Sequence, residues 1–200
     1  MKQGLLVVLS GPSGVGKGTV CRQLLNICPE ITLSVSMTTR PPRIGEREGV
    51  DYHFTSVKHF QSLVRDGAFL EWAQVYGHYY GTLTREVLQT LSGGTSLLLE
   101  IDIQGARQVR RKIDSAVYIF LAPPSREILK ERIDGRGTED AAAISRRLAE
   151  SCQEMEAYRE YDYLVVNDQV ERAADCLAAI ITAEGCKVSR GAKPLGWEVS

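Results

Sequence analysis

The sequence lacks long apolar runs, a secretory leader pattern and an excess of either charge. No apolar run approaches the length of a membrane span. The early run LLVVLS is too short for a signal-peptide core, and a glycine-rich loop follows it instead of a cleavage site. A net charge of -1 and a pI of about 6.3 argue against a nucleic-acid polycation. We therefore expect a cytoplasmic protein that binds neither membrane nor nucleic acid.

Paired cysteines and a histidine triad are missing as well. The five cysteines are odd in number and contain no CxxC pair: Cys21, Cys28, Cys152, Cys176 and Cys186. This pattern predicts free thiols in a reducing compartment and no metal cluster. The three histidines (His53, His59 and His78) form no triad with a serine or cysteine nucleophile, so we interpret them as surface or packing residues.

What the sequence does contain is an alternation of short apolar runs with helical patterns, over a length that suits one compact unit. Near-continuous apolar runs, typical of strands buried on both faces, occur at Leu5–Leu9, Ser96–Glu100, Val117–Leu121 and Tyr163–Val166. Helical patterns occur at Lys17–Leu25, Ile103–Lys112, Ser125–Ile133, Ile144–Tyr158 and Val170–Glu184. The alternation predicts an α/β domain with a mostly parallel sheet.

Three segments interrupt this alternation. The stretch from Ser34 to Thr82 is rich in arginine, turn formers and aromatic residues, and it predicts an inserted subdomain with antiparallel strands and a helix near Ser56–Arg65. The stretch DGRGTEDAAA joins two helical patterns and carries Gly135 and Gly137, which predicts a mobile lid. The polar tail 186–200 is expected to be loosely held.

A phosphate-binding loop follows the first apolar run. Residues 11–19 read GPSGVGKGT, namely Gly11, Pro12, Ser13, Gly14, Val15, Gly16, Lys17, Gly18 and Thr19. Glycines let backbone N–H groups converge on phosphate oxygens, the following helix adds its positive end, and Lys17 supplies a cation. Gly18 stands where this motif usually has a serine or threonine, so the hydroxyl ligand for Mg²⁺ is in question.

Two acids follow the leucine run at 97–99. Glu100 and Asp102 lie at the end of a predicted strand, where carboxylates of a parallel sheet come close to bound phosphates. A strand-end acid is also an ordinary surface feature. Asp102 begins the sequence DIQG, which fits a GTPase switch motif, but the NKxD motif that reads guanine in GTPases is missing. A P-loop GTPase is therefore an alternative with less support.

Several blocks resemble the guanylate kinase family in sequence and in order. They are SVSMTTRPPRIGEREGVDYHF, FLEWAQVYGHYYGT, LEIDIQGA, FLAPPS, GRGTE and YDYLVVND, and they cover roughly residues 5–185. The resemblance implies a P-loop core with a five-stranded sheet flanked by helices, a small mixed or antiparallel GMP-binding subdomain, and a helical lid. The implied ranges are 1–33, 84–126 and 158–185 for the core, 34–83 for GMP binding, 127–157 for the lid and 186–200 for the tail.

The resemblance also implies roles for single residues. The residues that match binders of the GMP phosphate are Arg40, Arg43, Tyr52 and Tyr80. The acids that match those reading guanine are Glu71 and Asp102. The hydroxyl groups that match contacts to the base belong to Ser36 and Thr82. Arg132, Arg136 and Arg147 match catalytic lid arginines, and Asn167 matches a position near adenine. These residue types suit the task, because guanidinium groups pair with phosphate and carboxylates accept from the guanine N–H donors.

The resemblance implies ATP:GMP phosphotransfer with Mg²⁺ as cofactor, carried out by a monomer or homodimer. Glu100 is expected to act on the metal through bound water and not as a direct ligand. A guanylate-kinase-like binding module without catalysis is the second alternative, and the intact GPSGVGK loop argues against it.

Overall fold

The core of the molecule is a five-stranded parallel sheet. The computed structural model describes residues 4–75, 77–134 and 141–192. The strand order is β2-β7-β1-β8-β9, and all four neighbouring pairs are parallel. The strands are β1 (Leu6–Ser10), β2 (Ile31–Leu33), β7 (Ser96–Glu100), β8 (Val117–Ala122) and β9 (Tyr163–Val166). The predicted parallel α/β fold is confirmed.

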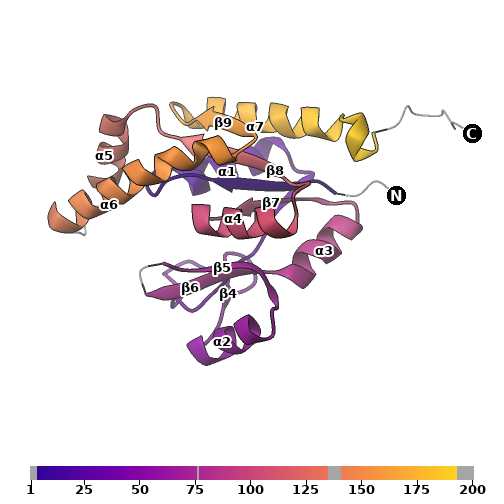
Figure 1. The fold of residues 1–200 in the computed structure, drawn as a ribbon, viewed down its shortest axis with the longest axis horizontal. Coiled ribbons are helices and arrows are strands. Elements are labelled where there is room, and N and C mark those ends of the chain that lie inside the picture. The colour runs from indigo at the N-terminus through magenta and orange to yellow at the C-terminus, as the bar shows by residue number, and fades with distance from the viewer. Residues whose placement is uncertain (1–3, 76, 135–140, 193–200) are drawn as a thin grey trace, which may run out of the picture.

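Both faces of this sheet are buried under helices. Val7 and Leu9 of β1 pack with α1 (Lys17–Ile27) and α7 (Val170–Gly185), which lie on one face. Leu6 and Val8 pack with α3 (Thr84–Ser92) and α4 (Ile103–Lys112) on the other face. Figure 1 shows α7 above the sheet and α4 below it. Because alternate side chains enter opposite cores, the strands contain continuous apolar runs.

A second, smaller sheet lies beyond α4 (Figure 1). Its strands are β3 (Met37–Thr38), β4 (His53–Phe54), β5 (Phe69–Val75) and β6 (His78–Leu83), in the order β4-β3-β6-β5. The β3–β4 pair is parallel and the other pairs are antiparallel, so the sheet is mixed. The predicted helix is confirmed as α2 (Val57–Arg65), which Ser56 caps by accepting a hydrogen bond from the His59 N–H.

The helices after β8 project to one side of the core (Figure 1). They are α5 (Arg126–Asp134), α6 (Ala141–Glu154) and the 3₁₀ segment η1 (Met155–Glu160). The prediction that a single helix runs to Tyr158 was wrong, because the α-helix ends at Glu154 and the chain tightens into a 3₁₀ turn before β9. Gly135 and Gly137, the expected hinge glycines, lie outside the described residues.

The first part of the tail is held against the core. Glu184, buried near the end of α7, pairs with Arg190 at 2.8 Å and with Lys187. Arg190 also donates to the Ser115 carbonyl. The expectation of a loosely held tail was therefore wrong for residues 186–192, because two cations neutralise one buried carboxylate.

Two sequence-based expectations concern the whole chain. All five cysteines are free, as predicted. Across residues 4–75, 77–134 and 141–192, no helix is long and apolar enough to cross a membrane.

Candidate active site

The phosphate loop joins β1 to α1 at the carboxyl end of the parallel sheet. Gly14 and Gly16 adopt φ of +83° and +93°, a left-handed conformation that favours glycine. A Cβ on Gly16 would lie 2.8 Å from Asn167 Nδ2, so the close packing of this loop also requires glycine. Among the described residues, no side chain caps the start of α1. The N–H groups there are available to an anion.

Lys17 places its ammonium group under this loop. Its Nζ donates to the carbonyl oxygens of Gly11 at 2.6 Å and Pro12 at 3.2 Å. Burial lowers the pKa of Lys17, while the carboxylates of Glu100, Glu154 and Asp102 act in the opposite direction. The cation therefore lies among acids at the end of the sheet, where bound phosphates would face it.

Three predicted side chains support the loop from outside. Asn167, almost fully buried, donates from Nδ2 to the Val15 carbonyl at 2.8 Å. Arg132 donates to the same carbonyl at 3.1 Å and to the Asn167 carbonyl at 3.0 Å. Arg147 on α6 reaches Ser13 Oγ at 3.2 Å. The structure thus brings two of the three predicted lid arginines to the loop; Arg136 lies outside the described residues.

Glu100 lies beside Gly18, the unusual position of the loop. An ideal Cβ on Gly18 would be 3.5 Å from Glu100 Oε1, an ordinary contact. Burial raises the pKa of Glu100, and the Lys17 charge opposes that shift. Burial and the Glu100 carboxylate together raise the pKa of the neighbouring Cys21 thiol well above its usual value. Thr19 is exposed, and its hydroxyl accepts from Arg22 Nη2 at 3.5 Å.

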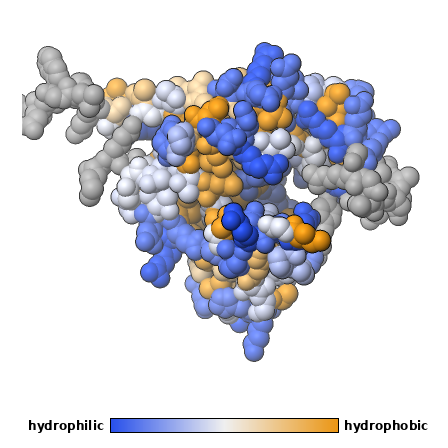
Figure 2. Space-filling view, turned by 180° about the vertical axis from the view of Figure 1, so that it is seen from behind, coloured by the Kyte–Doolittle hydropathy of each residue, from blue (hydrophilic) through white to orange (hydrophobic). Residues whose placement is uncertain are grey.

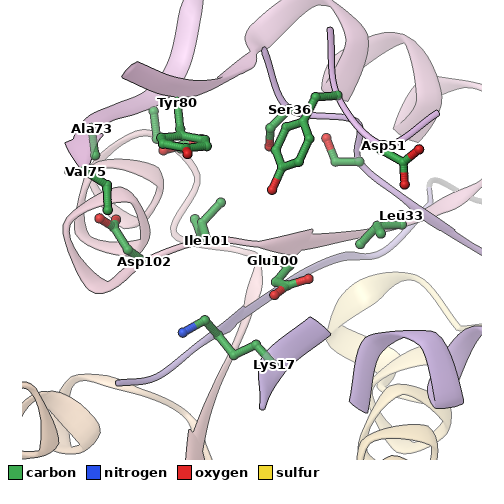
Figure 3. Close-up of a pocket in the computed structure, with 13 residues that line it drawn as sticks. Lys17, Leu33, Ser36, Asp51, Ala73, Val75, Tyr80, Glu100, Ile101 and Asp102 are labelled. Carbon is green, nitrogen blue, oxygen red and sulfur yellow. The ribbon is translucent and has the colours of Figure 1, made fainter. Parts of the chain in front are cut away.

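A cavity of about 300 Å³ separates the core from the small mixed sheet. In Figure 3, Lys17 and Glu100 lie on its core side, and Tyr80, Ser36 and Asp51 lie opposite. Glu71 of β5 lines the cavity and is 4% exposed; its Oε1 accepts from Thr82 Oγ1 at 2.6 Å. Burial raises the pKa of Glu71 to about 7, the Asp102 charge adds to this shift, and the Thr82 hydrogen bond opposes it.

Asp102 and Glu71 meet at the start of α4. Asp102 caps this helix, because its Oδ1 accepts from the Gly105 N–H at 2.7 Å. A Cβ on Gly105 would lie 2.6 Å from Glu71 Oε2, so only glycine leaves room for that carboxylate. Two acceptors from different elements therefore converge in the lining of the cavity.

Arg40, Tyr52 and Tyr80 cluster together, and the two tyrosines line the same cavity. The Arg40 guanidinium lies 5.3 Å from the Tyr52 ring centroid, and the rings of Tyr52 and Tyr80 are 6.0 Å apart. Glu46 pairs with Arg40 at 2.7 Å and accepts from the Arg43 backbone N–H at 2.7 Å. The side chain of Arg43 is exposed, so the structure does not bring it into this cluster.

A second cavity, of about 650 Å³, adjoins the first. The loop, α4 and α6 surround it, and Lys17, Val75 and Asp102 line both cavities. Figure 2 shows the surface hollowed between the core and the small subdomain. Lys17 therefore lies where the two cavities meet, and a phosphate in one would be adjacent to a phosphate in the other.

Sequence reasoning missed several residues of this site. Glu46 organises the arginine loop, Cys21 lies against Glu100, and Ser151 and Glu154 bind the phosphate loop from α6. An acid three residues after the second arginine of RPPR was a usable signal for Glu46. Nothing local in the sequence pairs Ser13 with residues about 140 positions later.

The parallel sheet, the glycine-rich loop at its carboxyl end and the two cavities that meet at a lysine define a P-loop phosphotransferase. A family model described as guanylate kinase matches residues 3–184, and the chain belongs to the guanylate kinase family.

Relatives are similar in sequence to this protein over nearly the whole chain. Guanylate kinase of Caldanaerobacter subterraneus subsp. tengcongensis is 49% identical, covering 94% of this chain and 92% of that protein. Guanylate kinase of Desulfitobacterium hafniense is 48% identical, covering 94% of each. The crystal structure of guanylate kinase from Anaplasma phagocytophilum superposes with a TM-score of 0.79 at 35% identity, covering 95% of this chain and 90% of that one.

Proposed function

We propose that this protein transfers the γ-phosphoryl group of ATP to GMP, giving ADP and GDP. Relatives that carry the name guanylate kinase are 48–49% identical over 94% of the chain. The observation that carries the proposal is the position of Lys17 between two adjoining cavities, one of which presents two carboxylates to a base. We assign GMP binding to residues 34–83 and the lid to 127–157.

The loop and the arginines act on ATP. Backbone N–H groups of the loop and of the first turn of α1 hold the β- and γ-phosphates, and Lys17 exchanges its loop carbonyls for phosphate oxygens. Phosphoryl transfer spreads negative charge over the equatorial oxygens, and positive groups stabilise it. Arg147, already at Ser13, supplies such charge, with Arg132 and Arg136 assigned to the same task.

The carboxylates select the base. Guanine presents an N1–H and an N2 amino group, and Glu71 and Asp102 provide acceptors for them. Adenine lacks both donors on that edge and would leave the buried Glu71 unpaired; a site of this kind can discriminate by about 10⁴–10⁵-fold. The base is also contacted by Ser36 and Thr82. The GMP phosphate is held by Arg40, Tyr52 and Tyr80. Arg43 is exposed here, and it joins them only after its own loop, residues 40–46, moves.

Mg²⁺ is the implied cofactor. Among the described residues, no three His, Cys, Asp or Glu side chains are grouped as a metal cage. That fits a cation that keeps waters and binds mainly to ATP oxygens. Glu100, next to Gly18, is the residue of this chain that would orient such waters. When bound, Mg²⁺ neutralises phosphate charge.

The free thiols indicate the cellular compartment in which the protein works. Cys21, Cys28, Cys152, Cys176 and Cys186 all remain unpaired. This state suits the reducing cytoplasm, to which we assign the protein.

Transfer of labelled phosphate tests the proposal. With ATP labelled at the γ-phosphoryl group and unlabelled GMP, we expect the label in GDP. Lys17→Met should lower kcat by about 10³-fold, by analogy with the loss of other transition-state donors, with a smaller change in ATP affinity. GMP binding without label transfer would instead support a non-catalytic binding module, and a Lys17→Met loss of less than tenfold would remove Lys17 from catalysis.

A further inference from the structure

Helix α6 binds every polar group of a single loop residue, Ser13. Arg147 Nη2 donates to Ser13 Oγ at 3.2 Å, and Ser151 Oγ donates to the Ser13 carbonyl at 3.2 Å. Glu154 Oε2 accepts from the Ser13 N–H at 3.1 Å. The three side chains are spaced by four and then three residues, so they lie on one stripe of the helix.

These contacts are partly buried, and they restrict a loop whose glycines restrict it little. Ser151 is fully buried and Arg147 nearly so. Ser13 directly precedes Gly14, and the glycines of the loop restrict the backbone little by themselves. Leaving a buried donor or acceptor without its partner is costly, so the three bonds fix the peptide groups around Ser13.

Glu154 supports the loop without blocking the phosphate site. Its bond goes to Ser13, whereas the N–H groups at the start of α1 carry no side-chain cap among the described residues. The Lys17 ammonium binds the Gly11 and Pro12 carbonyls. The carboxylate faces the Lys17 charge across the second cavity, and Asp102 and Glu150 add negative charge nearby.

We propose that Ser151 and Glu154 are positioning residues that lock the phosphate loop to α6, so that Arg147 reaches the phosphates only when the loop has its binding shape. This inference rests on the proposed phosphotransfer. Ser151 and Glu154 act through Ser13 and Arg147 and do not themselves touch the nucleotides.

The test uses variants of Glu154 that separate hydrogen bonding from charge. Glu154→Met keeps the length but removes the acceptor, and it should lower kcat by between about tenfold and about 100-fold, as expected for misplaced catalytic groups, with KM for GMP unchanged. Glu154→Gln restores an acceptor without charge and should recover most of that loss. Glu156→Gln, at an exposed position two residues later, is the charge control and should behave as wild type.

Hydrogen exchange at the Ser13 amide gives a readout that needs no activity. It should be faster in Glu154→Met than in wild type and near wild type in Glu154→Gln. If wild type shows no GMP kinase activity, the proposed function fails, while unchanged exchange with normal activity overturns only the lock.

Kinetics can overturn the lock in a second way. An unchanged kcat in Glu154→Met would mean that Glu154 does not position the loop. A raised kcat with a lower KM for ATP would mean that Glu154 competes with the phosphates for the loop. If the Met variant does not fold, Ser151→Ala decides: the lock predicts a lower kcat with KM for GMP unchanged, and a wild-type kcat contradicts it.

Discussion

At the scale of single residues, we propose that Glu71 makes base recognition depend on pH. Burial raises its pKa to about 7, so the free enzyme carries a largely neutral Glu71 at pH 6 and a charged one at pH 8. The guanine N–H donors require the charged acceptor. We therefore expect KM for GMP to fall as pH rises towards 7, by up to about tenfold per pH unit for one proton.

The Glu71→Gln variant isolates the contribution of the Glu71 charge to GMP binding and to its pH dependence. The GMP phosphate also titrates, near pH 6, but it does so equally with both enzymes. In the variant, kcat/KM for GMP should drop by about 10–100-fold, the effect of one lost charge-assisted hydrogen bond, and the Glu71 part of the pH dependence should vanish while KM for ATP stays constant. Parallel pH profiles in the two enzymes would take Glu71 out of the base site.

We propose that Gly18 and Glu100 set the Mg²⁺ dependence of this loop. The Thr19 hydroxyl lies one residue further along α1, which rotates it by about 100° from position 18, and Thr19 is exposed. We expect Thr19→Ala to leave the Mg²⁺ dependence of activity unchanged, and Glu100→Gln to shift it to higher Mg²⁺ concentration. Titrating Mg²⁺ at fixed ATP measures both, and a shift in the Thr19 variant alone would reverse the assignment.

At the scale of elements, the packing of α4 against β5 forms the proposed base site. A Cβ on Gly105 would meet Glu71 Oε2 at 2.6 Å, and because that atom ends a side chain, the carboxylate would give way before the backbone. Gly105→Ala should therefore raise KM for GMP by about tenfold or more, a displacement effect, with little change in KM for ATP.

Gly185→Ala is the matched control for this change. A Cβ there meets nothing within 4 Å at the end of α7, so it should leave kinetics unchanged and stabilise the fold by at most about 1 kcal/mol. Equal kinetics in the two alanine variants would contradict the close approach of Glu71 to α4.

Some elements could be predicted from the sequence because their determinants are local. The continuous apolar run of β1 and the glycine loop after it predicted strand, turn and helix together. Neither β2 nor α3 was predicted. The edge strand β2 has three residues and pairs with one neighbour, so its pattern is too short to recognise. Helix α3 exposes much of its length, and its burial is limited to Val87 and Leu91.

At the scale of the whole molecule, the site depends on contacts between distant segments. The loop motif and the arginine cluster were readable in the sequence. The bonds from α6 to Ser13 were not readable, since they depend on where the chain folds back, and neither was the exposure of Arg43. Local motifs therefore predicted the reaction that the protein carries out. Tertiary packing determines which side chains position the phosphate loop and the arginines for that reaction.

The same packing creates two adjoining cavities that share Lys17. The central claim is that ATP donates to a monophosphate whose base is read by carboxylates. An assay of ADP formation with ATP and, in turn, GMP, AMP, UMP and CMP tests this most directly. We predict that kcat/KM for GMP exceeds that for AMP by about 10⁴-fold or more, because adenine would leave the carboxylates unpaired. Comparable rates with AMP, or no ADP formation with GMP, would contradict the account.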